Sequence, residues 1–320
     1  MKKTTLLKMA AVFLSTTAIA HAQYPNQPIR VIAPFAAGGS VDIVARMVGD
    51  PLGKALGTPV VVENKSGASG MIGAQQVADA KPDGYTLLAN SSIHVIVPSL
   101  YPKITYDALN DLQPVSQITL VPLVLVASPS APFKDVKEMI AWGKKQASGM
   151  SYASAGNGST PHLAGEMLGE ATGVSVVHVP YKGSGAAMLD VMGNQVPVMF
   201  DALTAVMSHI QGGKLKALAV ASPQRVPTLP DVPTFAELGY PQFDLSTWHG
   251  IWAPKNTPKE IVDKLSGELA RISHEPDMRK RIEDLGGQPV GNSPEEFDAF
   301  ARSEHKKWGD MIKRFNVVLE

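Results

Sequence analysis

The sequence contains no cysteine, which excludes both a disulfide-stabilised scaffold and a cysteine-ligated metal site. After residue 22 it also has no unbroken apolar run of about 18 residues, the length that a membrane-spanning helix requires. Neither sign of charge is in excess, because 29 lysine and arginine residues face 29 aspartate and glutamate residues. Without a basic excess the chain cannot recruit nucleic acid or an anionic membrane by charge, so we expect neither as a partner.

Motifs that carry enzyme chemistry are missing as well. The sequence has no G-x-x-x-x-G-K-[ST] phosphate loop, no G-x-S-x-G nucleophile elbow and no H-E-x-x-H zinc motif. The segment KGSGAAM begins like a dinucleotide-binding motif, but Met188 occupies the position of the third glycine. The S-x-x-K match from Ser303 to Lys306 falls inside a predicted exposed helix. We therefore expect no catalytic residue, no cofactor and no metal site.

The first 22 residues have the layout of a Sec-type signal peptide. Lys2, Lys3 and Lys8 form a basic start, and the apolar run from Ala10 to Ala20 is too short to span a bilayer. Ala20-His21-Ala22 fits the small-x-small cleavage pattern, so we expect cleavage after Ala22 and a periplasmic protein. An exported chain of this size without disulfides fits the periplasm better than a small secreted scaffold.

Strand-like and helix-like segments alternate along the remaining chain. The strands IRVIAP, PVVVENK and YTLLAN alternate with helices predicted at 41–56 and 71–80, the order of a parallel sheet covered by helices. A long apolar stretch at 115–128 follows. Pro122 in its middle predicts either two strands or one bent strand.

The alternation then restarts. Helices are predicted at 136–146, 162–170, 186–192 and 205–211, with the strands MSYAS, VSVVHV, PVMFD and KLKALAV around them. After an irregular proline-rich segment, TWHGIWAP leads to helices at 258–272 and 294–315, with Thr257 and Ser293 as predicted N-caps. Two such blocks predict two α/β domains, with crossings before Ser128 and around Trp248 to Pro254. We expect the C-terminal helices to return to the first domain, an assignment that periodicity alone does not give.

Two strand-to-helix loops are rich in small residues. In PFAAGGSVD, Gly38 and Gly39 allow close approach of a ligand to the backbone, and Ser40 or Asp42 can cap the following helix. The alternative is an ordinary tight turn. In SAGNGSTPHL, the hydroxyl groups of Ser154, Ser159 and Thr160 can act as donors or simply cap the helix.

Both loops lead into a helix N-terminus without contributing Arg or Lys. Free backbone N–H groups and the helix dipole favour an anion at such a place. If the two domains face each other, the loops can clasp a carboxylate between them. Asp201, at the carboxyl end of its strand, either faces this ligand or caps the next helix, and His162 is either a packed helix residue or part of the site.

Four segments resemble the Bug family, the extracytoplasmic solute receptors of tripartite tricarboxylate transporters: PFAAGGSVDIVAR, SAGNGSTPHLAGEML, VPYKGSGAAMLDVMGNQVPVMFD and TWHGIWAP. The resemblance runs over essentially the whole of residues 23–320. It implies a type II-like periplasmic-binding-protein fold of two α/β lobes, each a mixed sheet flanked by helices, joined by a double-crossover hinge. We assign residues 23–122 and 252–320 to one lobe and residues 123–251 to the other.

The resemblance also implies a ligand and a site. The ligand is a small organic carboxylate, namely a dicarboxylate, a tricarboxylate or an aromatic acid, and the partners are the permease subunits of the transporter, with the receptor itself a monomer. The implied ligand-binding residues come from four segments. They are Phe35, Ala36, Gly38, Gly39 and Ser40; Asn90, Ser91, Ser92 and His94; Ser154, Gly158, Ser159, Thr160 and His162; and Asp201.

Two alternatives stay open from the sequence. A periplasmic hydrolase on a two-lobe scaffold would draw on Tyr181, Lys182 and Ser184, although no motif activates them. A sensor that presents its loaded form to a membrane kinase would have the same cleft. The role of Asp201 is ambiguous, because a carboxylate repels an anionic ligand. Asp201 can accept a hydrogen bond from an ammonium or hydroxyl group on the ligand, or it can orient a loop without contacting the ligand.

Overall fold

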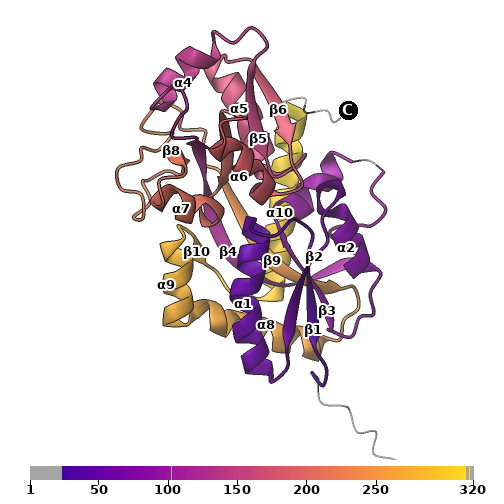
Figure 1. The fold of residues 1–320 in the computed structure, drawn as a ribbon. Helices are drawn as coiled ribbons and strands as arrows, with labels where there is room; N and C mark the ends of the chain where they lie inside the picture. Colours follow the sequence, from indigo (N-terminus) through magenta and orange to yellow (C-terminus); the bar gives the residue numbers. More distant parts are fainter. Residues whose placement is uncertain (1–23, 102, 315–316, 318–320) are drawn as a thin grey trace, which may run out of the picture.

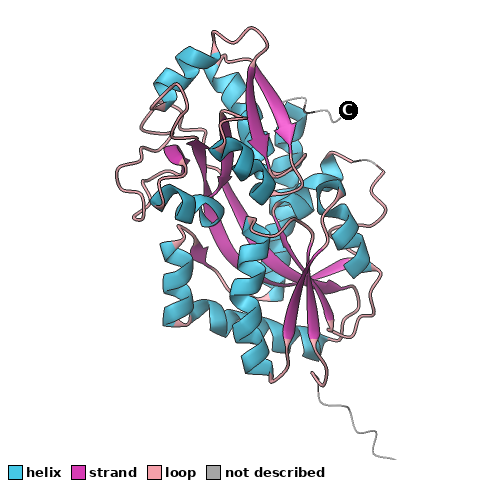
Figure 2. Cartoon of the chain, viewed as in Figure 1, coloured by secondary structure: helices cyan, strands magenta, loops and turns pink. Residues whose placement is uncertain are grey.

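The computed structural model describes residues 24–101, 103–314 and 317, and the predicted signal peptide lies outside these residues. The strands are β1 (Ile29–Ala33), β2 (Val60–Asn64), β3 (Thr86–Ser91), β4 (Leu112–Ala127), β5 (Met150–Ser154), β6 (Val176–Pro180), β7 (Val198–Ala202), β8 (Lys216–Ala221), β9 (Ser246–Pro254) and β10 (Gln288–Pro289). They form one mixed sheet in the order β2-β1-β3-β9-β4-β7-β5-β6, with β8 and β10 paired to β4. Helices cover both faces of this sheet (Figures 1 and 2).

The α-helices are α1 (Ser40–Leu56), α2 (Met71–Ala78), α3 (Ile93–Ile96), α4 (Val136–Gly143), α5 (Thr160–Thr172), α6 (Ser184–Met192), α7 (Leu203–Gln211), α8 (Lys259–His274), α9 (Pro276–Asp284) and α10 (Pro294–Arg314). Short 3₁₀ turns at Ala68–Gly70 and Val97–Ser99 precede α2 and follow α3. None of the described helices is long and apolar enough to cross a membrane.

The sheet has two halves, which meet at β4. In the first half β1 pairs in parallel with β2 and β3, and in the second half β5 pairs in parallel with β6 and β7. These parallel strands and the helices between them confirm the two predicted strand-helix blocks. The antiparallel strands β9 and β4 complete the sheet between the blocks.

Strand β4 runs through both halves. From Leu112 to Pro122 it pairs with β9, and from Leu123 to Ala127 it pairs with β7 and β8. Of the two predicted possibilities, the structure therefore has a single strand, which changes partners directly after Pro122. Proline has no backbone N–H and cannot donate a hydrogen bond to a neighbouring strand. The chain returns beside this point, because the Leu123 N–H donates to the Leu245 carbonyl oxygen at 2.9 Å.

The C-terminal segment differs in part from its prediction. Helix α9 and strand β10 were not predicted. Helix α9 is short and mostly polar, and it begins at Pro276, directly after Glu275, whose extended backbone ends α8. The N-cap of α8 is Pro258 rather than Thr257, whose hydroxyl group donates instead to the Pro254 carbonyl oxygen at 2.7 Å. Ser293 is the predicted cap of α10, and its Oγ accepts the Glu296 N–H at 3.2 Å.

Each half has its own hydrophobic core, and α10 takes part in both. Phe297 and Ala301 of α10 pack with core residues of the first half, whereas Trp308 packs with those of the second. Between them, Oε2 of Glu304 accepts the indole N–H groups of Trp248 and Trp308 at 3.1 and 2.9 Å. Helices α8 and α9 pack with the first half, whereas α10 extends along both halves (Figure 1).

Candidate functional site

A cavity lies where the two halves meet. It contains about 420 Å³ of empty space, part of which is open to solvent. The lining residues come from both halves and from the loops that precede helices. They are Phe35, Gly39, Ser40, Val41, Ser91, Ser92, Ile93, Ala155, Ser159, Thr160, Pro161, Gly183, Ser184, Asp201, Ala202 and Thr247.

The N-termini of four of the longer helices, α1, α5, α6 and α7, converge on this cavity. The first residues of α1, α5 and α6 and the residue before α7 all line it, as does the start of the short helix α3. The N–H groups of a first helical turn have no acceptor within the helix, and the dipole makes this end positive. Asp201 is the only ionisable side chain among the described residues that line the cavity, which include no lysine, arginine or histidine. Backbone N–H groups and hydroxyls are therefore the donors that the described lining offers to an anion.

The loop before α1 is fixed by Asp42. Its Oδ2 accepts the N–H of Gly38 at 3.0 Å, and its Oδ1 accepts from Arg46 at 2.9 Å and from Asn64 at 3.0 Å. Burial acts to raise the pKa of Asp42, but these hydrogen bonds outweigh it and hold the pKa below its usual value. Asp42 is therefore a fixed anion that shapes the loop. Gly38 adopts a φ of +81°, which a larger side chain would strain.

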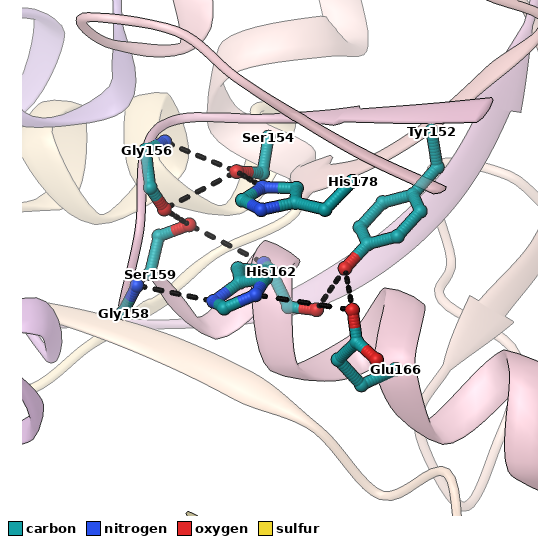
Figure 3. Close-up of polar contacts among 8 residues, drawn as sticks. All are labelled: Tyr152, Ser154, Gly156, Gly158, Ser159, His162, Glu166 and His178. Atoms are coloured by element: carbon teal, nitrogen blue, oxygen red, sulfur yellow. Dashed lines mark hydrogen bonds and ion pairs between the residues drawn. The ribbon is translucent and has the colours of Figure 1, made fainter. Parts of the chain in front are cut away.

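The loop before α5 is held by its own hydroxyl groups (Figure 3). The Ser154 Oγ accepts the Gly156 N–H at 3.1 Å and lies 2.6 Å from Nε2 of His178. The Ser159 hydroxyl donates to the Gly156 carbonyl oxygen at 2.7 Å and its Oγ accepts the His162 N–H at 3.3 Å, which makes Ser159 the N-cap of α5. Both serine hydroxyls are thus engaged within the loop that forms the cavity wall.

Two stacked histidines support the same loop. The rings of His162 and His178 are 3.9 Å apart between centroids, and Nδ1 of His162 accepts the Gly158 N–H at 3.1 Å (Figure 3). Burial lowers the pKa of His162 to about 4, and burial together with the neighbouring His162 lowers the pKa of His178 to about 3. Nδ1 of His162 must be unprotonated to accept this bond, so the loop geometry requires a neutral ring.

Contacts across the cavity hold the two halves together. The Ala36 N–H donates to the Lys182 carbonyl oxygen at 3.2 Å, and the hydroxyl groups of Ser92 and Thr160 lie 2.6 Å apart. Gly185 approaches the first half so closely that a Cβ atom there would lie 2.8 Å from the Ala37 carbonyl oxygen. The structure is therefore in a closed arrangement.

Asp201 is buried in the cavity wall, with 1% of its surface exposed. Its Oδ1 accepts from the Ser184 hydroxyl at 2.9 Å and from the Ala202 N–H at 2.8 Å. Its Oδ2 is buried without a partner among the described residues. Burial raises the pKa of Asp201 to about 7, against the opposing effect of the two hydrogen bonds.

The structure brings part of the predicted set to the cavity. Of the predicted residues, those that line it are Phe35, Gly39, Ser40, Ser91, Ser92, Ser159, Thr160 and Asp201. Those outside its lining are Ala36, Gly38, Asn90, His94, Ser154, Gly158 and His162. Several of these act in the loops behind the wall, as described above, whereas His94 packs against Trp252 and its Nε2 lies 3.0 Å from the Ala108 carbonyl oxygen.

The residues of the hydrolase alternative do not form a catalytic group. The Tyr181 hydroxyl donates to Asp190, and Lys182 is exposed. Ser184 bonds to Asp201, but no described histidine or lysine side chain lines the cavity as a base for it. Among the described residues, no group of three or more histidine or acidic side chains is arranged to hold a metal ion.

Comparison with known proteins places the chain in a family. A family model described as the tripartite tricarboxylate transporter family receptor matches residues 44–317. The chain belongs to this receptor family. Its relative BugT of Bordetella pertussis is 37% identical to it over 326 residues, which cover 100% of both chains.

Solved structures resemble this chain over nearly its whole length. The periplasmic binding protein BugD has a TM-score of 0.89 at 41% identity, covering 93% of this chain and 100% of its own. Rpa4515 of R. palustris, solved with adipate, has a TM-score of 0.89 at 31% identity over 92% of this chain and 99% of its own. MatC of Rhodopseudomonas palustris, solved with malate, has a TM-score of 0.85 at 34% identity over 90% and 100%.

These comparisons confirm the resemblance and the two-lobe periplasmic-binding-protein fold class. The family consists of solute-binding receptors rather than enzymes, and its solved members include periplasmic binding proteins.

The sequence did not predict all of the residues that line the cavity. Gly183, Ala202 and Thr247 line it without having been predicted, and Ser184 was considered only for the hydrolase alternative. A signal for Gly183 and Ser184 was present, because KGSG leads into a helix N-terminus in the same way as the two predicted loops do. Thr247 lies at the start of β9 and reaches the cavity through the pairing of β9 with β3 and β4.

Proposed function

We propose that the protein is a periplasmic receptor that captures a small organic carboxylate between its two lobes and delivers it to the permease subunits of a tripartite transporter. The observation that carries this proposal is the convergence of four helix N-termini on a cavity whose described lining has no cationic side chain. The relatives solved with adipate and malate support the same ligand class. The ligand is a dicarboxylate, a tricarboxylate or an aromatic acid.

The two halves of the sheet act as the lobes. Residues 23–122 form one lobe with the C-terminal segment, and residue 123 begins the other. Because β9 pairs along its whole length with the first-half part of β4, we place the return crossing between Leu245 and Ser246 rather than after residue 251. The hinge then consists of two adjacent strand segments, and the lobes open around it to admit the ligand.

The protein works as a monomer after a signal peptide at residues 1–22 has directed it to the periplasm. It carries out no chemistry on its ligand. An open form releases the carboxylate to the permease, and a closed form such as the present structure retains it. Only a ligand with higher affinity for the closed form can shift this equilibrium.

A thermal-shift screen tests the proposal. Purified protein is heated with a panel of organic acids, sugars, amines and metal ions. An acid present at about 100 times its dissociation constant stabilises the fold by about 2.7 kcal/mol, which raises the melting temperature clearly. A shift with sugars or amines and none with any acid would contradict a carboxylate receptor.

A further inference from the structure

Asp201 poses an electrostatic problem for the proposed ligand. It is the only ionisable residue in the described lining of the cavity, and it carries the same charge as a carboxylate. Two carboxylates in one water-poor site cannot both remain ionised without a large energetic cost, so the pKa of one of them rises strongly. A carboxylate receptor with Asp201 in its wall must resolve this repulsion.

Hydrogen bonding determines which oxygen of Asp201 can carry a proton. Oδ1 accepts from both the Ser184 hydroxyl and the Ala202 N–H, so it remains an acceptor. Oδ2 is buried and has no partner among the described residues. A buried polar atom without a partner is costly, and an occupant of the cavity that bonds to Oδ2 removes that cost.

The helices that surround Asp201 favour an anion there over a cation. Asp201 directly precedes the N-cap of α7, and its partner Ser184 is the first residue of α6. An ammonium group on a ligand would meet the positive ends of both helices, whereas one negative charge beside them is stabilised. The site therefore suits a single negative charge, on Asp201 when the cavity is empty and on the ligand when it is filled.

Among the described residues, no neighbouring charge stabilises or destabilises the ionised form of Asp201. Burial and the bonds from Ala202 and Ser184 account for the pKa of Asp201, and no charged group contributes to it. On β4, the residue paired with Asp201 is the apolar Val124. Asp42 of α1 accepts a hydrogen bond from its own loop, and Lys182, in the segment before α6, is exposed.

The remaining titratable neighbours are engaged elsewhere. Tyr181 and Asp190 bond to each other, and His162 and His178 stack behind the loop before α5. On β9, Nδ1 of His249 lies 2.8 Å from the Thr119 hydroxyl, and burial lowers the pKa of His249 to about 3. His209 lies in the last turn of α7, at the opposite end from Asp201. None of them supplies a counter-charge to Asp201.

We propose that Asp201 takes up a proton from solvent on Oδ2 as the carboxylate binds, and that this O–H donates to a carboxylate oxygen of the ligand. The inference rests on the proposed function and deepens it, because it makes capture of the acid a coupled uptake of anion and proton. The ligand carboxylate that faces Asp201 then replaces the negative charge that Asp201 loses. Affinity is highest where Asp201 is already protonated and falls as pH rises above the pKa of the empty site.

Calorimetry on the wild-type protein measures the coupling directly. Succinate, malate, adipate, citrate and benzoate are titrated at about pH 8, where these acids are fully ionised, in two buffers with different ionisation enthalpies. Each bound acid should take up about one proton, and its affinity should fall about tenfold per pH unit above neutrality. Binding without proton uptake and with a flat pH profile overturns the inference while leaving the proposed function intact. If none of the acids binds at any pH, the proposed function fails and the inference fails with it.

Two variants identify the group. Asp201→Asn keeps the acceptor for Ser184 and supplies N–H donors to the ligand, so it should bind within about threefold of the wild-type affinity at low pH and show no proton uptake. If this variant lost tenfold or more in affinity and still took up a proton on binding, as the wild type does, Asp201 would instead be ionised and would accept a hydrogen bond from the ligand.

Ser184→Ala removes a hydrogen bond that stabilises the ionised form of Asp201. The affinity of this variant should therefore begin to fall at a higher pH than that of the wild type. Asp263→Asn, an exposed carboxylate on α8, is the matched control and should retain full uptake.

Discussion

The hydroxyl groups of Ser92 and Thr160 lie 2.6 Å apart, although the two residues belong to opposite halves of the sheet. Ser92 precedes the short helix α3 in the first half, and Thr160 begins α5 in the second. Both line the cavity, and Ser92 also lies 2.9 Å from the hydroxyl of Thr247. The contact that joins the two halves is therefore also part of the cavity wall.

Replacing Thr160 with valine removes this contact and keeps the shape of the side chain. The affinity for the best-binding acid should fall by about 3- to 10-fold, the effect of one neutral hydrogen bond of about 1 kcal/mol. Isothermal titration measures the change. Thr105→Val, which removes an exposed hydroxyl bonded to Gln75 outside the cavity lining, is the control. Equal affinities for the two variants would show that the contact does not stabilise the closed form.

Gly185→Ala should hinder closure of the two halves without destabilising the fold. Alanine is favoured over glycine in a helix by up to about 1 kcal/mol, so the melting temperature should stay the same or rise. In the closed arrangement, however, its Cβ would lie 2.8 Å from the Ala37 carbonyl oxygen of the other half. Affinity should therefore fall at least about tenfold, on the scale of 1.4 kcal/mol, and solution scattering with the acid should give a larger radius of gyration than for wild type.

Gly267→Ala in α8 is the matched control for that variant, because a Cβ atom there meets nothing within 4 Å. It should raise the melting temperature without changing affinity. If Gly185→Ala binds and compacts as the wild type does, the two halves do not need to approach as closely as they do here.

The neutral His162 should make the fold sensitive to acid. Its folded pKa of about 4 lies below the ordinary value near 6.5, so the unfolded chain takes up a proton before the folded chain does. The contribution to stability is full above about pH 6.5 and is lost as pH falls towards 4, by about 2 kcal/mol at about pH 5. His162→Asn, which keeps an acceptor for the Gly158 N–H, should lose less unfolding free energy between neutral pH and pH 5.

Urea unfolding at several pH values measures this difference. His274→Asn replaces an exposed histidine on α8 and should lose stability with pH as the wild type does. A parallel decline for the His162 variant and the wild type would show that this ring does not carry the acid sensitivity.

The parts of the site that sequence could predict are those with a local signal. The loops that contain Gly39 and Thr160 follow buried strands and start helices, so small residues at these places are enough to indicate an anion site. The partners across the cavity have no such signal. Thr247 is close to Ser92 only because β9 pairs with β3, and the approach of Gly185 to Ala37 depends on how the two halves lie against each other.

The same limit applies to the fold. The strand-helix alternation predicted the two blocks, since hydrophobic periodicity is local. It left open whether the stretch around Pro122 is two strands or one bent strand, and it did not predict the new partners of β4 after Pro122, because pairing is a long-range property. Helix α10 showed a clear helical pattern, yet its contact with both cores depends on where Trp308 lies after folding. The sequence of a helix does not by itself predict the lobe with which the helix packs.

The central claim is that the cavity recognises a negative charge through helix N-termini, and one calorimetric comparison tests it most directly. The strongest-binding acid is titrated beside its primary amide, which has nearly the same shape and no charge. The account predicts that the acid binds at least about 100-fold more tightly, since a charged group at these N–H donors gains more than a neutral one. Equal affinities for the acid and the amide would contradict it.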